Sequence, residues 1–150
     1  MSRIKSLIKT DNDIAPFIAR IFLGLVIFPH GAQKILGIWG GHGLQAMMDS
    51  FQAWFGIHPV VSALVAFAEF FGSLALILGL FGRFMAATIV MVMLGAIYYV
   101  VNDFFFMNWY SQERGEGYEF HILAIALGLI VIIKGSGKYA LDAWIYKKLN

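Results

Sequence analysis

The chain contains no cysteine, which excludes a disulfide framework, a cysteine-ligated metal or cluster, and a dithiol relay carried by this chain itself. Charge is also scarce, because only 13% of the 150 residues are charged, against about 25% in a soluble domain. The net charge is only +2, so nucleic acid is not expected as a partner. Apolar residues make up 60% of the chain. We therefore expect a lipid bilayer to cover most of the surface, which argues against a soluble enzyme.

Long apolar runs fill most of the sequence. A membrane-spanning helix needs about 20 such residues, because the hydrocarbon layer is roughly 30 Å thick. Four stretches meet or nearly meet this length, at about residues 14–37, 60–82, 83–102 and 118–134. The runs are continuously apolar and do not alternate, which favours helices over a membrane barrel. The sequence thus predicts one all-α domain over residues 1–150, a polytopic membrane protein with four transmembrane helices in an antiparallel bundle.

A further, shorter helix is expected between the first two spans, over about residues 44–55. Its apolar residues fall on one helical stripe, and polar residues lie opposite. Gly56 and Pro59 are placed to end it. Such a helix is typical of one that lies in the membrane interface, here on the outer side.

The basic residues predict the orientation. If four helices alternate, eight of the eleven Lys and Arg residues fall on one side: Arg3, Lys5, Lys9, Arg83, Lys134, Lys138, Lys147 and Lys148. The positive-inside rule then places both termini in the cytoplasm. Asp13 is expected to cap the first span, and the basic N-terminus does not have the pattern of a cleaved leader. We expect an integral protein of the bacterial cytoplasmic membrane.

Ionisable and polar residues occur within or at the outer ends of all four predicted spans. Because such groups are costly in hydrocarbon, they usually face a bundle interior or a cavity. His30 and Glu69 fall roughly 10 and 14 Å inside the outer ends of their helices. The sequence therefore predicts a shared polar pocket in the outer half of the membrane, formed by His30, Lys34, Glu69, Tyr98, Tyr99, Asn102, Glu119 and His121.

Other charged residues and glycines are placed to organise the helices. Arg20 is expected either to extend its side chain to the inner interface or to pair with an acid in the bundle. Arg83 is expected to extend its side chain to the interface or to contact a lipid phosphate. Pro29 is expected to bend the first span. Two faces combine charge with small residues that permit close helix packing, namely Arg20, Gly24, Gly31 and Lys34 on one helix, and Glu69, Gly72, Gly79 and Arg83 on another.

Three segments together resemble the DoxX family of small four-helix membrane proteins. They are RIFLGLVIFPHGAQKI (residues 20–35), AEFFGSLALILGLFGR (68–83) and GYEFHILAIALGLIVIIKGSGKYALD (117–142). The resemblance implies that His30, Lys34, Glu69, Arg83, Glu119 and Asp142 are family positions. It also implies a link to redox systems, since relatives are associated with thiosulfate:quinone oxidoreductase subunits, redox-stress complexes and quinone resistance.

The first functional hypothesis is a membrane subunit of a redox system that binds a quinone or a similar lipid-soluble molecule. Quinone reduction consumes protons, so carboxylate and imidazole groups near the ring would have a chemical role. We assign catalytic roles to His30, Glu69 and Glu119, substrate binding to Lys34, Tyr98, Asn102 and His121, and structural roles to the charges of Arg20, Arg83 and Asp142. Because no side chain here carries electrons alone, a soluble or membrane redox partner is expected.

Three alternatives remain open at this point. A transporter could use the kinked helix and the intramembrane charges, and with so few helices it would need a homo-oligomer. A membrane assembly or anchor protein would use the pocket for structure only. A haem between His30 and His121 is a weaker hypothesis, and a metal held by these two residues with Glu69 and Glu119 fits no known short motif, so no metal site is predicted.

Overall fold

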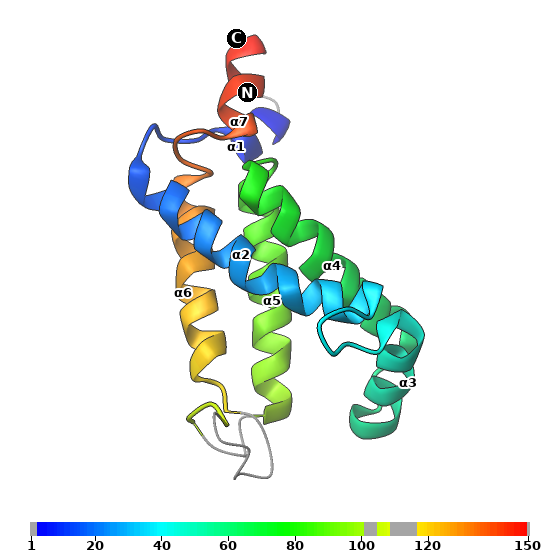
Figure 1. Ribbon diagram of the computed structural model, residues 1–150. Helices are drawn as coiled ribbons and strands as arrows, with labels where there is room; N and C mark the ends of the chain where they lie inside the picture. Colours follow the sequence, from blue (N-terminus) through cyan, green and yellow to red (C-terminus); the bar gives the residue numbers. More distant parts are fainter. Residues whose placement is uncertain (1–2, 101–104, 109–116, 150) are drawn as a thin grey trace.

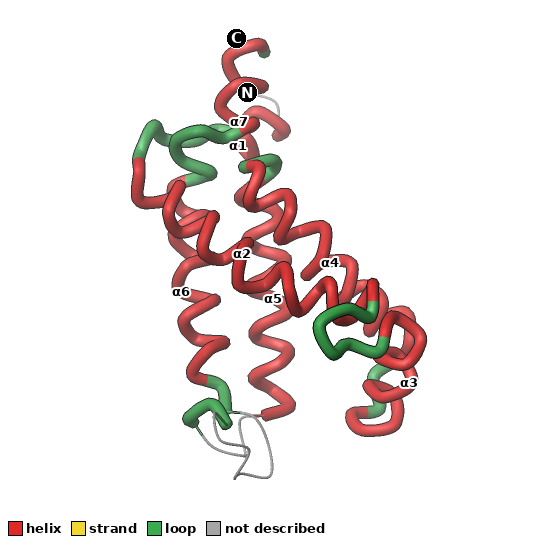
Figure 2. Tube along the Cα trace, viewed as in Figure 1, coloured by secondary structure: helices red, strands yellow, loops and turns green. Residues whose placement is uncertain are grey.

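The computed structural model describes residues 3–100, 105–108 and 117–149, and these residues contain helices and no strand (Figures 1 and 2). The helices are α1 (Arg3–Ile8), α2 (Ile14–Leu36), α3 (Gly43–Phe55), α4 (Pro59–Leu78), α5 (Gly82–Val100), α6 (Glu119–Lys134) and α7 (Leu141–Lys148). The predicted all-α class is thus confirmed. The short helices α1 and α7 were not predicted, because six and eight residues are too few for a clear periodic pattern.

Four helices pack around one another. Helix α2 contacts α4 and α6, and α5 contacts the same two helices from the other side. Figure 1 shows both chain ends, with α1 and α7, at one end of this group and α3 at the other. Helices α2, α4 and α5 are each long and apolar enough to cross a membrane. Helix α6 has 16 residues, so the fourth crossing and the antiparallel transmembrane bundle stay predictions.

Local signals set several helix ends as expected. The Asp13 carboxylate accepts a hydrogen bond from the Ala15 amide at 3.0 Å, which confirms the predicted cap of α2. Helix α3 occupies the segment where an amphipathic helix was predicted. One boundary differs, because Gly79 adopts a left-handed conformation (φ 67°) and ends α4 after Leu78. Arg83 belongs to α5, as the span predicted at residues 83–102 implied, but the predicted single helical face running from Glu69 to Arg83 is wrong.

The core lies where α2, α4, α5 and α6 meet. Its members are buried apolar side chains: Ala19, Leu23, Ile27, Leu76, Ala86, Ile89, Met93, Ala124 and Val131. Gly24 and Gly31 are buried on the face of α2 that meets α4. An added Cβ at Gly31 would overlap the backbone of Phe70, so only glycine permits this approach.

Arg20 stabilises the end of the molecule that carries the termini. It is 1% exposed, so the expected extension of its side chain to the interface is wrong. Its partners are carbonyl groups and not a paired acid, because its guanidinium donates hydrogen bonds to the backbone oxygens of Leu76, Ile77, Ser136, Lys138 and Tyr139. Arg20 thus joins the end of α4 to the segment between α6 and α7.

Asp142 and Arg83 complete these connections. Asp142 accepts hydrogen bonds from the amides of Phe81 and Gly82, at 2.7 and 2.9 Å, and from the Ser136 hydroxyl at 2.6 Å. Arg83 donates to the carbonyls of Lys9, Ile132 and Ile133. It therefore binds two carbonyls in the last turn of α6 and one after α1, and the expected reach of its side chain to the interface or a lipid phosphate stays a prediction.

Candidate functional site

Lys34 of α2 and Glu69 of α4 form an ion pair. The Glu69 side chain is only 4% exposed, and the Lys34 side chain is 22% exposed. The pair forms because Gly31 brings α2 against α4 one turn before Lys34, so the lysine can reach across the contact. Two residues of the predicted pocket, on separate helices, are therefore in direct contact.

The ion pair lies in the wall of a large groove of about 750 Å³. Helices α3, α4 and α5 form most of the groove, and Lys34 is contributed by α2. The lining residues are Lys34, Phe51, Phe55, Ile57, Val61, Leu64, Val65, Ala68, Glu69, Thr88, Met91, Val92, Gly95, Ala96, Tyr99 and Val100. Within this set only Lys34 and Glu69 carry charge, and Thr88 and Tyr99 add hydroxyl groups to a lining that is otherwise apolar.

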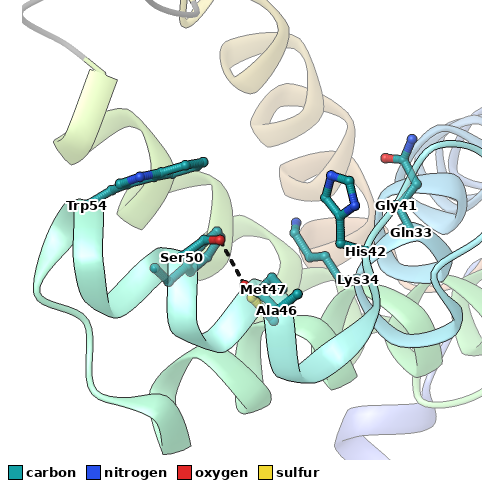
Figure 3. A pocket seen from close by; sticks show the side chains of 9 residues that line it. Gln33, Lys34, Gly41, His42, Ala46, Met47, Ser50 and Trp54 are labelled. Carbon is teal, nitrogen blue, oxygen red and sulfur yellow. Dashed lines mark hydrogen bonds between the residues drawn. The ribbon is translucent and has the colours of Figure 1, made fainter.

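A second, smaller cavity of about 170 Å³ lies between α3, the end of α2 and the loop that joins them. Its wall is formed by Gln33, Lys34, Gly41, His42, Ala46, Met47, Ser50, Phe51 and Trp54. Figure 3 shows Gln33, Lys34 and His42 at one end of this cavity and Trp54 at the other. Lys34 and Phe51 line both the groove and this small cavity.

His30 lies close to the ion pair but does not line the groove. It precedes Lys34 by one turn on α2, and its side chain is exposed. Its ring packs against Phe120 of α6, with 5.8 Å between the ring centroids. His30 is therefore next to the pair, on the side of α2 that faces α6.

The remaining predicted residues lie elsewhere. Tyr98 is 75% exposed and does not line the groove, whereas its neighbour Tyr99 does. Glu119 and His121 belong to the first turn of α6 and line neither cavity. Asn102 lies outside the described residues. Of the predicted pocket, Lys34, Glu69 and Tyr99 line one groove, and His30 lies one turn before Lys34 on α2.

Within the described part of the chain, no group of three or more His, Asp or Glu residues could hold a metal ion. The set of His30, Glu69, Glu119 and His121, considered from the sequence, therefore does not assemble into a metal centre. The Glu69 carboxylate of α4 instead pairs with Lys34 of α2.

Sequence reasoning missed the contribution of α3 to both cavities. Phe51 and Phe55 line the groove, and Phe55 also packs on Tyr99 with ring centroids 5.0 Å apart. The predicted apolar stripe of this helix already contained both phenylalanines. Their position shows that part of the stripe faces the protein, in addition to any contact with the membrane interface.

Comparison with protein families shows to which family the chain belongs. The family model for DoxX matches residues 15–102, which cover α2 from its second residue, all of α3, α4 and α5, and both residues of the ion pair. The chain belongs to the DoxX family. The match ends before α6, so the resemblance of residues 117–142 is carried by sequence pattern alone. No curated protein and no solved structure matched the chain.

Proposed function

We propose that this DoxX protein is the membrane subunit of a redox system and binds a quinone, or a similar lipid-soluble molecule, in the groove beside Lys34 and Glu69. The observation that carries the proposal is the position of one ion pair in the wall of a largely apolar groove. The groove volume of about 750 Å³ lies within the roughly 300–1,000 Å³ typical of small-molecule sites.

The groove matches the two parts of such a molecule. A quinone combines an apolar body and tail with carbonyl oxygens that accept hydrogen bonds. Apolar side chains of α4 and α5, such as Leu64 and Met91, would contact the tail. The Lys34 ammonium would donate a hydrogen bond to one ring oxygen, and the Tyr99 hydroxyl is a second candidate donor.

The ion pair also supplies the proton chemistry that quinone reduction requires. A quinone that accepts two electrons takes up two protons to become a quinol. Glu69 would exchange these protons, and Lys34 would stabilise negative charge on the ring oxygen. The electrons must come from a redox partner, because no side chain of this chain carries them. His30 would act as a neighbour that passes protons to the pair.

The test is to purify the protein in a mild detergent, extract it with organic solvent and identify the released molecules by mass spectrometry. We expect a quinone in the wild-type extract and at least tenfold less in Lys34→Met and in Ala96→Leu, which fills the groove. Lys134→Met is the matched control, because Lys134 lies 3.9 Å from Asp11 in an exposed ion pair. Equal quinone in all variants, or none in the wild type, would contradict the proposal.

A further inference from the structure

The large groove is open along one side. Three of its lining residues are also exposed on the surface of α4 and α5, namely Leu64 at 63%, Met91 at 69%, and Gly95. Both helices are long and apolar enough to cross a membrane, so this open side faces hydrocarbon when the protein lies in a bilayer. A molecule dissolved in the membrane therefore has direct access to the groove.

Helix α3 covers the groove at one end. Phe51 and Phe55 of this helix line the groove, and the Phe55 ring packs on the Tyr99 ring of α5 with 5.0 Å between the centroids. Figure 1 shows α3 at the end of the molecule opposite the chain termini. An amphipathic helix at such an end lies at the membrane interface, next to water. The aromatic pair therefore stands between the groove and the water at this end.

The α5 wall of the groove has the length and the space for a hydrocarbon chain. Its lining residues recur at spacings of three and four along one helical stripe: Thr88, Met91, Val92, Gly95, Ala96, Tyr99 and Val100. From its first to its last residue this stripe runs about 18 Å, which is more than half of the roughly 30 Å hydrocarbon layer. An added Cβ at Gly95 would meet nothing within 4 Å, so the middle of the stripe borders open space.

The charged residues of the groove favour a ligand whose head carries no net charge. Lys34 and Glu69 neutralise each other in their ion pair, so a charged head would find no free counter-charge among the lining residues. Burying a charge in a largely apolar site is costly, whereas a carbonyl oxygen needs only a hydrogen-bond donor. Fatty acids and phospholipids are disfavoured for this reason.

We propose that the groove binds single-chain molecules with an uncharged head, which enter sideways from the bilayer through the open side of α4 and α5. The contact between Phe55 and Tyr99 closes the groove against entry from water at the α3 end. The inference rests on the proposed function and narrows its ligand to quinones that carry a hydrocarbon chain. The route of entry can be tested without any quinone.

The first experiment tests the entrance with nitroxide labels, each attached to one introduced thiol in a chain that has no cysteine. Ala96→Cys places the label in the groove, Leu94→Cys on the exposed face of α5, and Trp54→Cys on the exposed surface of α3. In lipid vesicles, oxygen collects in hydrocarbon and a nickel chelate stays in water. Oxygen should relax the Ala96→Cys label within twofold of the Leu94→Cys label. The nickel chelate should relax it at least tenfold less than the Trp54→Cys label.

Two phenylalanines provide a matched test of the closed end. Phe55→Ala removes the ring that packs on Tyr99, whereas Phe67→Ala removes a ring of similar exposure, 42% against 40%, that does not line the groove. With the label on Ala96→Cys, Phe55→Ala should raise relaxation by the nickel chelate at least threefold, and Phe67→Ala should leave it unchanged. Equal relaxation in these two backgrounds would show that the aromatic pair does not close the groove.

The second experiment tests the ligand class with four probes: a benzoquinone with a decyl chain, the same ring with a methyl group in place of the chain, decylbenzene, and decyl sulfate. A molecule that binds only the folded protein raises its melting temperature. The decyl quinone should raise it by about 3 °C or more, and the other probes by less than about 1 °C. The rise should be lost in Ala96→Leu, which fills the groove, and kept in Ala87→Leu, a partly buried position of α5 outside the groove.

The outcomes separate this inference from the proposed function. If the methyl quinone or decyl sulfate stabilises the protein as much as the decyl quinone does, the ligand class is wrong and quinone binding is kept. If decylbenzene does so, the proposed function is rejected and the membrane entrance is kept. If no probe raises the melting temperature, both the function and the ligand class are rejected.

The labels decide the entrance in the same way. If oxygen fails to relax the Ala96→Cys label, a second copy of the chain covers the open side and sideways entry is wrong. If the nickel chelate relaxes it as strongly as the Trp54→Cys label, the groove opens to water and sideways entry is again wrong. Should Ala96→Cys fail to fold, Gly95→Cys takes its place and is judged by the same ratios.

Discussion

Gly31 of α2 lies directly against the backbone of Phe70 in α4, so closely that a single added methyl group has no space. This contact brings the two helices together one turn before Lys34 and places its ammonium at Glu69. The absence of a side chain at one position is therefore the structural condition for the ion pair.

The first prediction concerns this contact. Gly31→Ala should destabilise the protein by about 1–3 kcal/mol, because the added methyl forces α2 and α4 apart. Gly95→Ala is the matched control, since an added Cβ there meets nothing within 4 Å. It should leave stability unchanged or raise it by about 0.5–1 kcal/mol, as alanine does in a helix. Thermal unfolding in detergent measures both, and equal melting temperatures would contradict the close approach.

The second prediction concerns the ion pair. Lys34→Met should cost about 1–3 kcal/mol, which is less than the roughly 3–5 kcal/mol of a fully buried pair because the lysine side chain is 22% exposed. Replacing both residues, in Lys34→Met/Glu69→Leu, should cost less than the sum of the single changes. A double-mutant cycle of thermal unfolding measures the coupling. Strict additivity would show that the two side chains do not stabilise each other.

The third prediction compares two arginines. Arg20 donates to five backbone carbonyls, and a lysine has only three N–H donors, so Arg20→Lys loses at least two of these buried or partly buried hydrogen bonds. The expected cost is about 3 kcal/mol or more. Arg83→Lys should cost less, because Arg83 binds three carbonyls and is only partly buried. The yield of folded protein and the melting temperature should rank wild type, Arg83→Lys and Arg20→Lys in that order.

The fourth prediction concerns Asp142, which holds the start of α5 through two amides and the Ser136 hydroxyl. Asp142→Asn should cost about 1–2 kcal/mol, because the amide has only one oxygen and loses the charge that favours a helix N-terminus. Ser136→Ala removes only the hydroxyl and should cost about 1 kcal/mol or less. Hydrogen exchange at the amides of Phe81 and Gly82 is the specific readout. Unchanged protection there in Asp142→Asn would refute the capping role.

The sequence predicted the helices well and their ends less well. Apolar runs and the Asp13 cap located α2, and the apolar stripe located α3, because hydropathy and capping depend on neighbouring residues. The break at Gly79 was harder to see, since a glycine in an apolar run is compatible with a continuing helix. That break is the reason why Glu69 and Arg83 do not share one continuous helical face.

The site was predicted in part. Depth within the helices selected Lys34 and Glu69, and the two side chains do meet. Depth alone could not show which way each side chain points around its helix. For that reason the substrate-binding role was assigned to Tyr98, although its neighbour Tyr99 lines the groove. Glu119 and His121 were assigned to the same pocket, although they line neither cavity.

The amino-acid sequence by itself determined that this is a helical membrane protein, which apolar segments are helices, and that a few ionisable residues within them need protein partners. These properties follow from local composition and periodicity. Only the tertiary structure decided the partners, such as the carbonyls 56 and 116 residues from Arg20 and the groove shared by α3, α4 and α5. Such partners depend on how whole helices are packed against one another, and the close contact at Gly31 sets that packing for α2 and α4.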